Sequence, residues 1–223
     1  MKIAIMQPTF LPWLGYFRMI ASVDAFVFLD SVQFERRSWQ SRNRIKLQDK
    51  IHFLSLSCQK APQKTPLTQI KLSPETKWRT KLLKTLHHGY AKARNFKKYH
   101  ALIERELHRH DHLVALNLSL IGAFCEDLGI KTPLFRSSEL DIAGAKRENL
   151  LLELCLHFGA DSYLSPEGSK NYLDTPYSKD LFAKNSIEIC YFDFEHPSYH
   201  QQGSGFIPYL SAVDYLLNGG TGL

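Results

Sequence analysis

Short apolar runs alternate with segments of helical spacing near the start of this chain. Residues 2–6 are nearly all apolar and residues 25–29 are apolar throughout, which is typical of strands buried in a parallel sheet. Residues 14–23 lie between them and carry apolar side chains at the three- and four-residue spacing of a helix. Together these segments predict a β-α-β unit.

The pattern changes in the middle of the chain and then returns. Residues 51–58 and 67–72 alternate as strands do. Residues 73–129 instead read as about three helices, with breaks near 89–95 and 110–112. Further strands are expected within 132–140, 161–173 and 187–195, and further helices at 146–160 and 206–220.

This order predicts an α/β fold, with a mostly parallel, Rossmann-like sheet flanked by helices and a helical insertion in the middle of the chain. We expect one domain over residues 1–223, in which residues 73–129 form a lobe beside the sheet. In such sheets ligands bind outside the carboxyl ends of the strands, so the loops that leave those ends are the first candidates for a site.

Composition excludes several classes of protein. The chain has 223 residues and is 44% hydrophobic, enough for a sizeable core, and it has no apolar run long enough to span a membrane. Its first residues lack the pattern of a signal peptide. Four cysteines lie far apart in apolar surroundings, which is typical of reduced thiols. We therefore expect a cytoplasmic protein.

The formal net charge of +6 favours an anionic ligand, and much of the excess lies in residues 77–109. The basic face of these helices is interpreted as solvated, with phospholipid or nucleic acid contact as the alternatives. We expect no nucleic-acid ligand for the site itself. The run HRHDH at 108–112 places only two histidines on one helix face, so no metal site is predicted.

The loop QPTFLPWLGYF follows the first strand and combines prolines with aromatic residues. Gln7 can both donate and accept hydrogen bonds, while Trp13 and Tyr16 offer flat surfaces with polar tips. Two interpretations remain open: the loop is a binding wall at the end of the strand, or it is a hydrophobic plug that joins loop to core.

The segment DSVQFERRSWQSRNRI follows the second predicted strand and concentrates arginine. Asp30 and Gln33 come directly after the strand. The residues that follow combine four guanidinium groups with an indole and an amide, namely Arg36, Arg37, Arg42, Arg44, Trp39 and Asn43. Because arginine forks match phosphate and carboxylate oxygens, the segment predicts an anion-binding site, with a charged structural hairpin as the alternative.

Two later segments complete the candidates. YLSPEGSKNYLD is a Ser/Gly turn after a strand, where backbone N–H groups can cradle an anion, although an ordinary connection to a helix fits equally well. His196 follows the last strand and is the preferred general base, because imidazole titrates near neutral pH. A purely structural histidine is the alternative.

These motifs carry a resemblance to a known family. The blocks MQPTFLPWLGYF, DSVQFERRSWQSRNRIK, SSELDI, GADSYLSPEGSKNYLD, the Y-H-Q at 199–201 and FIPYLSAVDYLLNGG look like successive blocks of the WbqC-like family, over residues 1–220. The resemblance implies a role in bacterial O-antigen and surface-polysaccharide synthesis, as an aminoacyl (glycyl) or acyl transferase acting on an amino sugar that is linked to a nucleotide or a lipid.

The resemblance also implies where the site lies. Its first two blocks fall on Gln7, Pro8, Pro12, Gly15, Tyr16 and Phe17 and on Asp30, Gln33, Arg42 and Asn43. Its later blocks fall on Ser165, Gly168, Tyr172 and Gln201, beside which Ser169 and Tyr199 are further candidates for substrate binding. Glu167 stands where many members have a second glycine, which weakens the case for an anion nest.

Three functions follow from this reading. The first is the aminoacyl or acyl transferase. In it, His196 or Asp30 takes the proton of the acceptor amine, Gln7 and Asn43 stabilise the oxyanion of the intermediate, and the arginines hold a phosphate. A carrier protein or tRNA is the candidate carrier of the donor, and the acceptor is an anionic small molecule such as a nucleotide-linked sugar. The sequence leaves any cofactor unknown. The second is an ATP-dependent ligase or nucleotidyltransferase related to H-x-G-H enzymes, although Trp13 and Tyr16 replace both histidines. The third is a non-catalytic protein that binds nucleotide-sugars.

Overall fold

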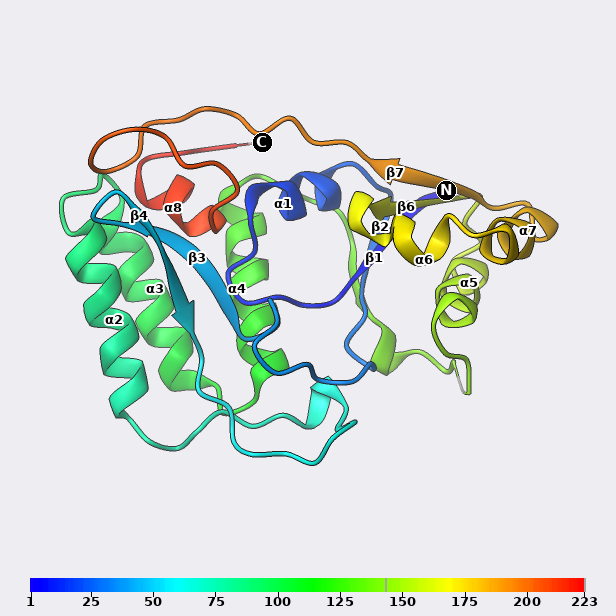
Figure 1. The fold of residues 1–223 in the computed structure, drawn as a ribbon, viewed down its shortest axis with the longest axis horizontal. Helices are drawn as coiled ribbons and strands as arrows, with labels where there is room; N and C mark the ends of the chain where they lie inside the picture. Colours follow the sequence, from blue (N-terminus) through cyan, green and yellow to red (C-terminus); the bar gives the residue numbers. More distant parts are fainter. Residues whose placement is uncertain (143, 223) are drawn as a thin grey trace. The chain divides into compact units, whose positions relative to one another are not determined.

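A computed structural model describes residues 1–142 and 144–222 (Figure 1). Its strands are β1 (Lys2–Met6), β2 (Ala25–Phe28), β3 (Arg42–Leu47), β4 (Lys50–Ser55), β5 (Leu134–Arg136), β6 (Ser162–Pro166) and β7 (Glu188–Phe192). Its α-helices are α1 (Leu14–Ala21), α2 (Lys77–Tyr90), α3 (Phe96–Arg109), α4 (Leu113–Asp127), α5 (Glu148–His157), α6 (Lys170–Leu173), α7 (Pro176–Lys184) and α8 (Ala212–Leu217).

The chain divides into two compact units, each built from separate stretches of sequence. The sheet unit comprises Met1–Gln7, Arg18–Asp30 and Lys131–Glu195. The helical unit comprises Pro8–Phe17, Ser31–Ile130 and His196–Leu223. The expected helical lobe is therefore one part of a larger unit, which also contains the first loop, the β3–β4 hairpin and the C-terminal segment.

A five-stranded parallel sheet forms the sheet unit, and its order is β5-β2-β1-β6-β7. Counted along the chain, these strands have the order 3-2-1-4-5, which confirms the Rossmann-like α/β class predicted from the sequence. The order reverses between β1 and β6. Ligands of such sheets commonly bind at this reversal, beyond the carboxyl ends of the two strands.

Apolar side chains on one face of the sheet form the core of this unit. Ile3 and Ile5 of β1 and Val27 of β2 pack with buried residues of the helices that follow β5 and β6, among them Leu154 and Phe182. Burial of this apolar area is the main stabilising term, at about 25 cal/mol for each Å² removed from water. The continuous apolar sequence of the strands follows from burial in a parallel sheet.

Three helices and a hairpin form the helical unit. Helices α2, α3 and α4 pack in sequence, and the antiparallel β3–β4 hairpin packs against α2. Each helix buries residues four apart, for example Leu82 and Leu86 of α2 and Ile103 and Leu107 of α3. This spacing places the buried residues on one face, which explains why residues 73–129 could be predicted as helices.

The first loop belongs to the core of the helical unit. Phe10 and Leu11 are fully buried. Two side-chain amides hold the backbone of this loop. Asn43 donates to the carbonyl oxygens of Phe10 (3.1 Å) and Leu11 (2.8 Å), and Asn117 donates to the carbonyl oxygen of Pro8 (3.0 Å). Of the two interpretations, these contacts support the hydrophobic plug for the middle of the loop.

Two local expectations were wrong. Residues 67–72 are not a strand, because Leu67–Gln69 form a turn of 3-10 helix and the rest makes only isolated bridges, from Lys71 to His112 and from Leu72 to Cys58. Residues 42–47 form β3, although their polar sequence was not interpreted as a strand. The strand forms because Asn43 and Ile45 are buried beside Leu54 of β4.

Candidate functional site

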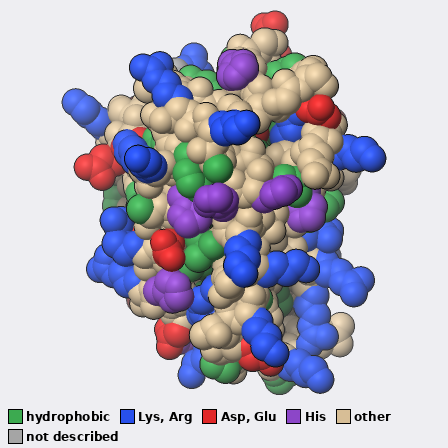
Figure 2. All heavy atoms as spheres, turned by 90° about the vertical axis from the view of Figure 1, so that its left-hand side faces the viewer, with side chains coloured by type: hydrophobic (Ala, Val, Ile, Leu, Met, Phe, Trp, Pro, Cys, Tyr) green, Lys and Arg blue, Asp and Glu red, His purple; other side chains and the backbone are tan. Residues whose placement is uncertain are grey.

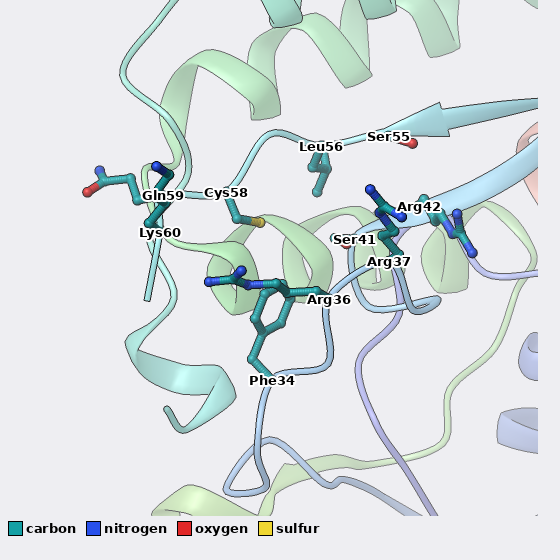
Figure 3. Close-up of a pocket in the computed structure, with 10 residues that line it drawn as sticks. All are labelled: Phe34, Arg36, Arg37, Ser41, Arg42, Ser55, Leu56, Cys58, Gln59 and Lys60. Carbon is teal, nitrogen blue, oxygen red and sulfur yellow. The ribbon is translucent and has the colours of Figure 1, made fainter. Parts of the chain in front are cut away.

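A cationic cavity of about 470 Å³ lies in the helical unit, beside the β3–β4 hairpin (Figure 3). Its walls come from the loop before β3, from the two strands and from the segment after β4. Ten residues line it: Phe34, Arg36, Arg37, Ser41, Arg42, Ser55, Leu56, Cys58, Gln59 and Lys60. The predicted arginine cluster and a lysine from a different segment therefore meet at one cavity.

The charges around this cavity are of one sign. Three arginines and Lys60 line it, and no aspartate or glutamate is among the lining residues. Arg36 also donates to the carbonyl oxygen of Ala61 (3.1 Å), which joins the two walls. The backbone of Arg37 has a φ of 60°, a left-handed conformation that non-glycine residues adopt at some energetic cost and that often marks binding sites. This arrangement can hold a phosphate or carboxylate group.

A thiol in the same wall is not an activated nucleophile. Cys58 is half-buried, and burial raises the pKa of its thiol to about 11. At neutral pH it is therefore protonated, whereas cysteine nucleophiles react as thiolates. The chemistry of the cavity is thus that of anion binding by fixed positive charges.

Next to the cavity, exposed and half-buried aromatic rings lie beside guanidinium groups; we call this surface the aromatic–arginine strip. Its members are Arg42, Phe53, Trp39, Arg44, Tyr209 and His196. The guanidinium carbon of Arg42 lies 4.7 Å from the centroid of the Phe53 ring, and that of Arg44 lies 5.2 Å from Trp39. The two rings are 6.2 Å apart. Because Arg42 also lines the cavity, cavity and strip are continuous.

The strip continues toward the C-terminal segment. Arg44 donates to the backbone oxygen of Tyr209 (3.0 Å). The Tyr209 ring contacts both Trp13 and His196, at centroid separations of 5.7 and 5.1 Å. Residues distant in sequence are thereby joined into one surface, which combines the flat rings and fixed cations that suit sugars, bases and anions.

His196 lies at the end of the strip with its tautomer set by the backbone. Its Nδ1 is 2.9 Å from the carbonyl oxygen of Pro197. Because a carbonyl only accepts, Nδ1 carries the proton and the neutral ring keeps its lone pair on Nε2. Burial lowers the pKa of the ring below its usual 6.5, so the neutral form dominates at pH 7. This is the protonation state that a general base requires.

Other predicted residues follow the strand ends of the sheet unit. Gln7 comes directly after β1, while Ser165 lies in β6 and Gly168 and Ser169 follow it. The register of β1 with β6 therefore brings these residues to the reversal of strand order. Ser165 and Ser169 are buried and share a hydrogen bond, so they also stabilise the turn. Tyr172 is exposed.

Asp30 is fully buried at the end of β2 and is bonded to a later segment. Its carboxylate accepts from the hydroxyls of Ser137 (3.2 Å) and Ser138 (2.8 Å), from the backbone N–H of Ser138 (2.9 Å) and from Nε of Arg136 (2.8 Å). These donors occupy its lone pairs and stabilise its charge. The proposal of a general base therefore rests on His196.

Three residues of the first two motifs pack within the helical unit. Tyr16 is buried, and desolvation raises its pKa well above the usual value. Asn43 is buried and uses its amide group on the backbone of the first loop. Gln33 is exposed and pairs through its backbone with Pro66. A side chain at Gly15 would collide with the Trp13 ring, which explains the glycine.

A buried polar network holds the segment that carries His196. Asp214 of α8 is fully buried and accepts hydrogen bonds from the hydroxyls of Tyr90 and Tyr199. Gln201 is buried too, and its amide donates to the backbone oxygen of Ile207 (2.8 Å) and accepts from the N–H of the same residue (2.9 Å). Tyr199 and Gln201 therefore position the loop that presents His196 and Tyr209.

Helix α2 contributes a second, basic groove. A cavity of about 610 Å³ lies between this helix and the hairpin and is lined by Leu47, His52, Thr76, Lys77, Thr80, Lys81, Lys84, Thr85 and His88. No acidic residue lines it, and α2 itself contains none. Lysine, arginine and histidine side chains gather on the face of the molecule shown in Figure 2. This groove can attract a polyanionic partner.

Sequence reasoning missed Phe53, Tyr209 and Lys60 as members of the site. Phe53 is an apolar residue at an exposed position of β4. A large apolar side chain that faces solvent is the signal that could have identified it as a site residue. Tyr209 joins the strip through Arg44, which is 165 residues away in sequence. Contacts over such separations follow from the fold and are not encoded in a local pattern.

Fold and site together define an α/β protein with a Rossmann-order sheet and a cavity lined by cationic side chains beside exposed aromatic rings. The chain belongs to the WbqC-like protein family, whose model matches residues 7–222. It is 33% identical over 223 residues to the protein of Mycobacterium tuberculosis named uncharacterized protein Rv1507c, a match that covers 98% of this chain and 94% of that relative. No solved structure is significantly similar. No helix in residues 1–142 and 144–222 is long and apolar enough to cross a membrane.

Proposed function

We propose that this protein is a transferase that moves an aminoacyl or acyl group onto the amine of a nucleotide- or lipid-linked amino sugar. The reaction would belong to the synthesis of bacterial O antigen or a related surface polysaccharide, the setting expected for the WbqC-like family. The observation that carries the proposal is the cationic cavity, which joins an exposed aromatic surface through Arg42.

The cavity supports a phosphorylated acceptor. Its arginines and Lys60 offer charge-assisted hydrogen bonds, which contribute on the order of 1.5–3 kcal/mol each. No carboxylate of the lining competes for these cations, so an anionic ligand would meet them directly. The exposed rings next to the cavity would then contact the organic part of the ligand that carries the phosphate.

The chemistry requires a neutral amine and a base to accept its proton. In the proposed reaction the sugar nitrogen attacks the carbonyl carbon of the donor, and the donor's carrier leaves from the tetrahedral intermediate. His196 takes the amine proton on Nε2, since its Nδ1 proton is directed to the backbone of Pro197. Because Nε2 is buried in this structure, this role requires the side chains around it to move when the acceptor binds. The amide of Asn43 already donates to two carbonyls, so we assign it no part in stabilising the oxyanion. Gln7, the other residue that the sequence suggests for this role, belongs to the sheet unit.

A binding and turnover experiment tests this function. The protein is screened by thermal shift against UDP-, GDP- and dTDP-linked amino sugars and their N-acetylated forms, and amide formation with glycyl and acyl donors is followed by mass spectrometry. A ligand at 100 times its dissociation constant should stabilise the fold by about 2.7 kcal/mol. Turnover of the free amine, but not of the N-acetylated sugar, is expected. Failure of every phosphorylated ligand to bind refutes the proposal, and binding without turnover makes the protein a non-catalytic binder.

Replacing His196 with glutamine is expected to lower kcat about 100-fold or more, with the acceptor affinity unchanged within about twofold, because only proton transfer is lost. Since the pKa of His196 lies below 6.5, wild-type kcat/KM should be at its maximum at pH 7. It should fall as the pH drops through that pKa, because the protonated ring cannot accept a proton. The variant should lack this acid limb. Exposed His200 provides the matched control, His200→Gln, which should retain both activity and pH profile. Equal activity of wild type and His196→Gln would remove His196 from the mechanism.

We further propose that the donor, held by an acidic carrier protein or by tRNA, approaches the basic groove of α2. Reversing two charges there, in Lys81→Glu/Lys84→Glu, should raise the KM for the donor roughly tenfold at low salt, through lost electrostatic steering. The KM for the acceptor should not change. The matched control reverses Lys179 and Lys184 of α7, which already pair with Asp174 and Asp180. An unchanged KM for the donor would leave the groove without this role.

A further inference from the structure

The rings of Trp39 and Phe53 form an exposed aromatic surface, which we call the platform. Packing of the fold does not account for the exposure of these two rings. Trp39 is 47% exposed and Phe53 43% exposed, and they are among the largest apolar side chains that the described residues leave open to solvent. Their centroids are 6.2 Å apart and their planes differ by 30°, so the rings present one broad surface. Large rings held together at a surface usually mark a binding site.

The arginines beside the platform favour a planar, anionic ligand. Arg42 and Arg44 lie on the same face of β3, and Phe53 lies directly opposite Arg44 on β4. Each guanidinium contacts one of the two rings, and that of Arg42 also borders the cationic cavity. A ligand that spans this surface would therefore place a flat apolar ring against the aromatic side chains and its negative charge in the cavity.

From this arrangement we propose that the ligand is a nucleoside diphosphate group, with its base stacked on Trp39 and Phe53 and its diphosphate in the cavity of Arg36, Arg37 and Arg42. This inference rests on the proposed function and narrows it, because it selects a nucleotide-linked sugar over a lipid-linked one. A lipid diphosphate offers the same charge but has no planar ring for the platform. Base stacking on aromatic side chains tolerates every base, so the proposal names the class of nucleotide and not its base.

The test compares ligands that share a diphosphate and differ in the base. UDP and inorganic pyrophosphate are titrated calorimetrically into the full-length protein at one salt concentration. UDP is expected to bind at least about tenfold more tightly than pyrophosphate, the increment of one stacked base. Tryptophan fluorescence should be quenched by UDP and not by pyrophosphate, and Trp39→Phe should remove most of that quenching.

Two variants separate the platform from the cavity. Trp39→Ala should bring the affinity for UDP down to that for pyrophosphate and leave the pyrophosphate affinity unchanged, while Trp39→Phe should keep most of the difference. Exposed Tyr177 of α7 provides the control, Tyr177→Ala, with no effect on either ligand. Two results would refute base stacking on the platform: equal binding of UDP and pyrophosphate to wild type, or a preference for UDP that remains in Trp39→Ala. Neither result would contradict the proposed transferase function. If neither ligand binds and the amino-sugar screen is also negative, the proposed function fails with it.

Discussion

Replacing Asp214 with alanine is expected to lower the free energy of unfolding by about 2–5 kcal/mol. The side chain is fully buried and is the acceptor for the hydroxyls of Tyr90 and Tyr199. Without it, both hydroxyls lose that acceptor, and each buried donor left unsatisfied costs about 1–3 kcal/mol. Urea denaturation of wild type and variant at pH 7 measures the difference.

The network has a graded set of controls. Tyr199→Phe removes the hydrogen bond to Asp214 (2.8 Å) and the longer one from Gln201 (3.3 Å), and should cost about 1–2 kcal/mol. Asp180→Ala removes an exposed carboxylate paired with Lys184 and should change stability by less than about 1 kcal/mol. A cost for Asp214→Ala no larger than that for Asp180→Ala would contradict a structural role of the network. Loss of stability should be accompanied by loss of ligand binding, because Tyr199 and Gln201 hold the segment of His196 and Tyr209.

The sheet could be predicted from sequence because its inner strands β1 and β2 are largely buried on both faces. Residues 3–6 and 25–28 lie in the centre of the sheet and are apolar without alternation, a pattern that few other structures produce. By contrast, β3 alternates arginine and lysine with buried residues. Its Lys46 is buried because the ammonium group donates to the backbone oxygens of Ser204 and Gly205, which lie about 160 residues away. Such tertiary partners are invisible in a local sequence pattern.

The same distinction holds for the candidate site. The density of arginine around Trp39 predicted an anion site, and the structure places Arg36, Arg37 and Arg42 at one cavity. The QPTFLPWLGYF loop was harder to interpret, because a ligand wall and a core plug require the same apolar residues. The plug became evident only from tertiary contacts, such as that of Asn117, whose amide donates to the carbonyl of Pro8 from α4. Sequence thus indicated that the arginines gather in one place, while the partners of each polar group came from the fold.

Changing Arg42 to lysine is expected to weaken binding of an anionic sugar nucleotide about tenfold or more, with little change in the melting temperature. Arg42 is half-buried between the Phe53 ring and the cavity, so its planar fork can stack and donate two parallel hydrogen bonds at once. Lysine keeps the charge but loses both properties. A loss of one bidentate contact, at about 1.5–3 kcal/mol, corresponds to a factor of ten or more in affinity.

Calorimetric titration with the same nucleotide-linked amino sugar and salt concentration measures the effect of Arg42→Lys. Arg109 of α3 is exposed and does not line the cavity, so Arg109→Lys is the matched control and should bind as wild type does. If Arg42 acted only as a point charge, lysine would substitute for it and the affinities would be equal. Equal affinities would therefore exclude a bidentate role for Arg42, and a variant that unfolds would assign it a structural role in the hairpin. A tenfold loss in a folded variant would instead show that the geometry of the guanidinium, and not the positive charge alone, recognises the phosphate.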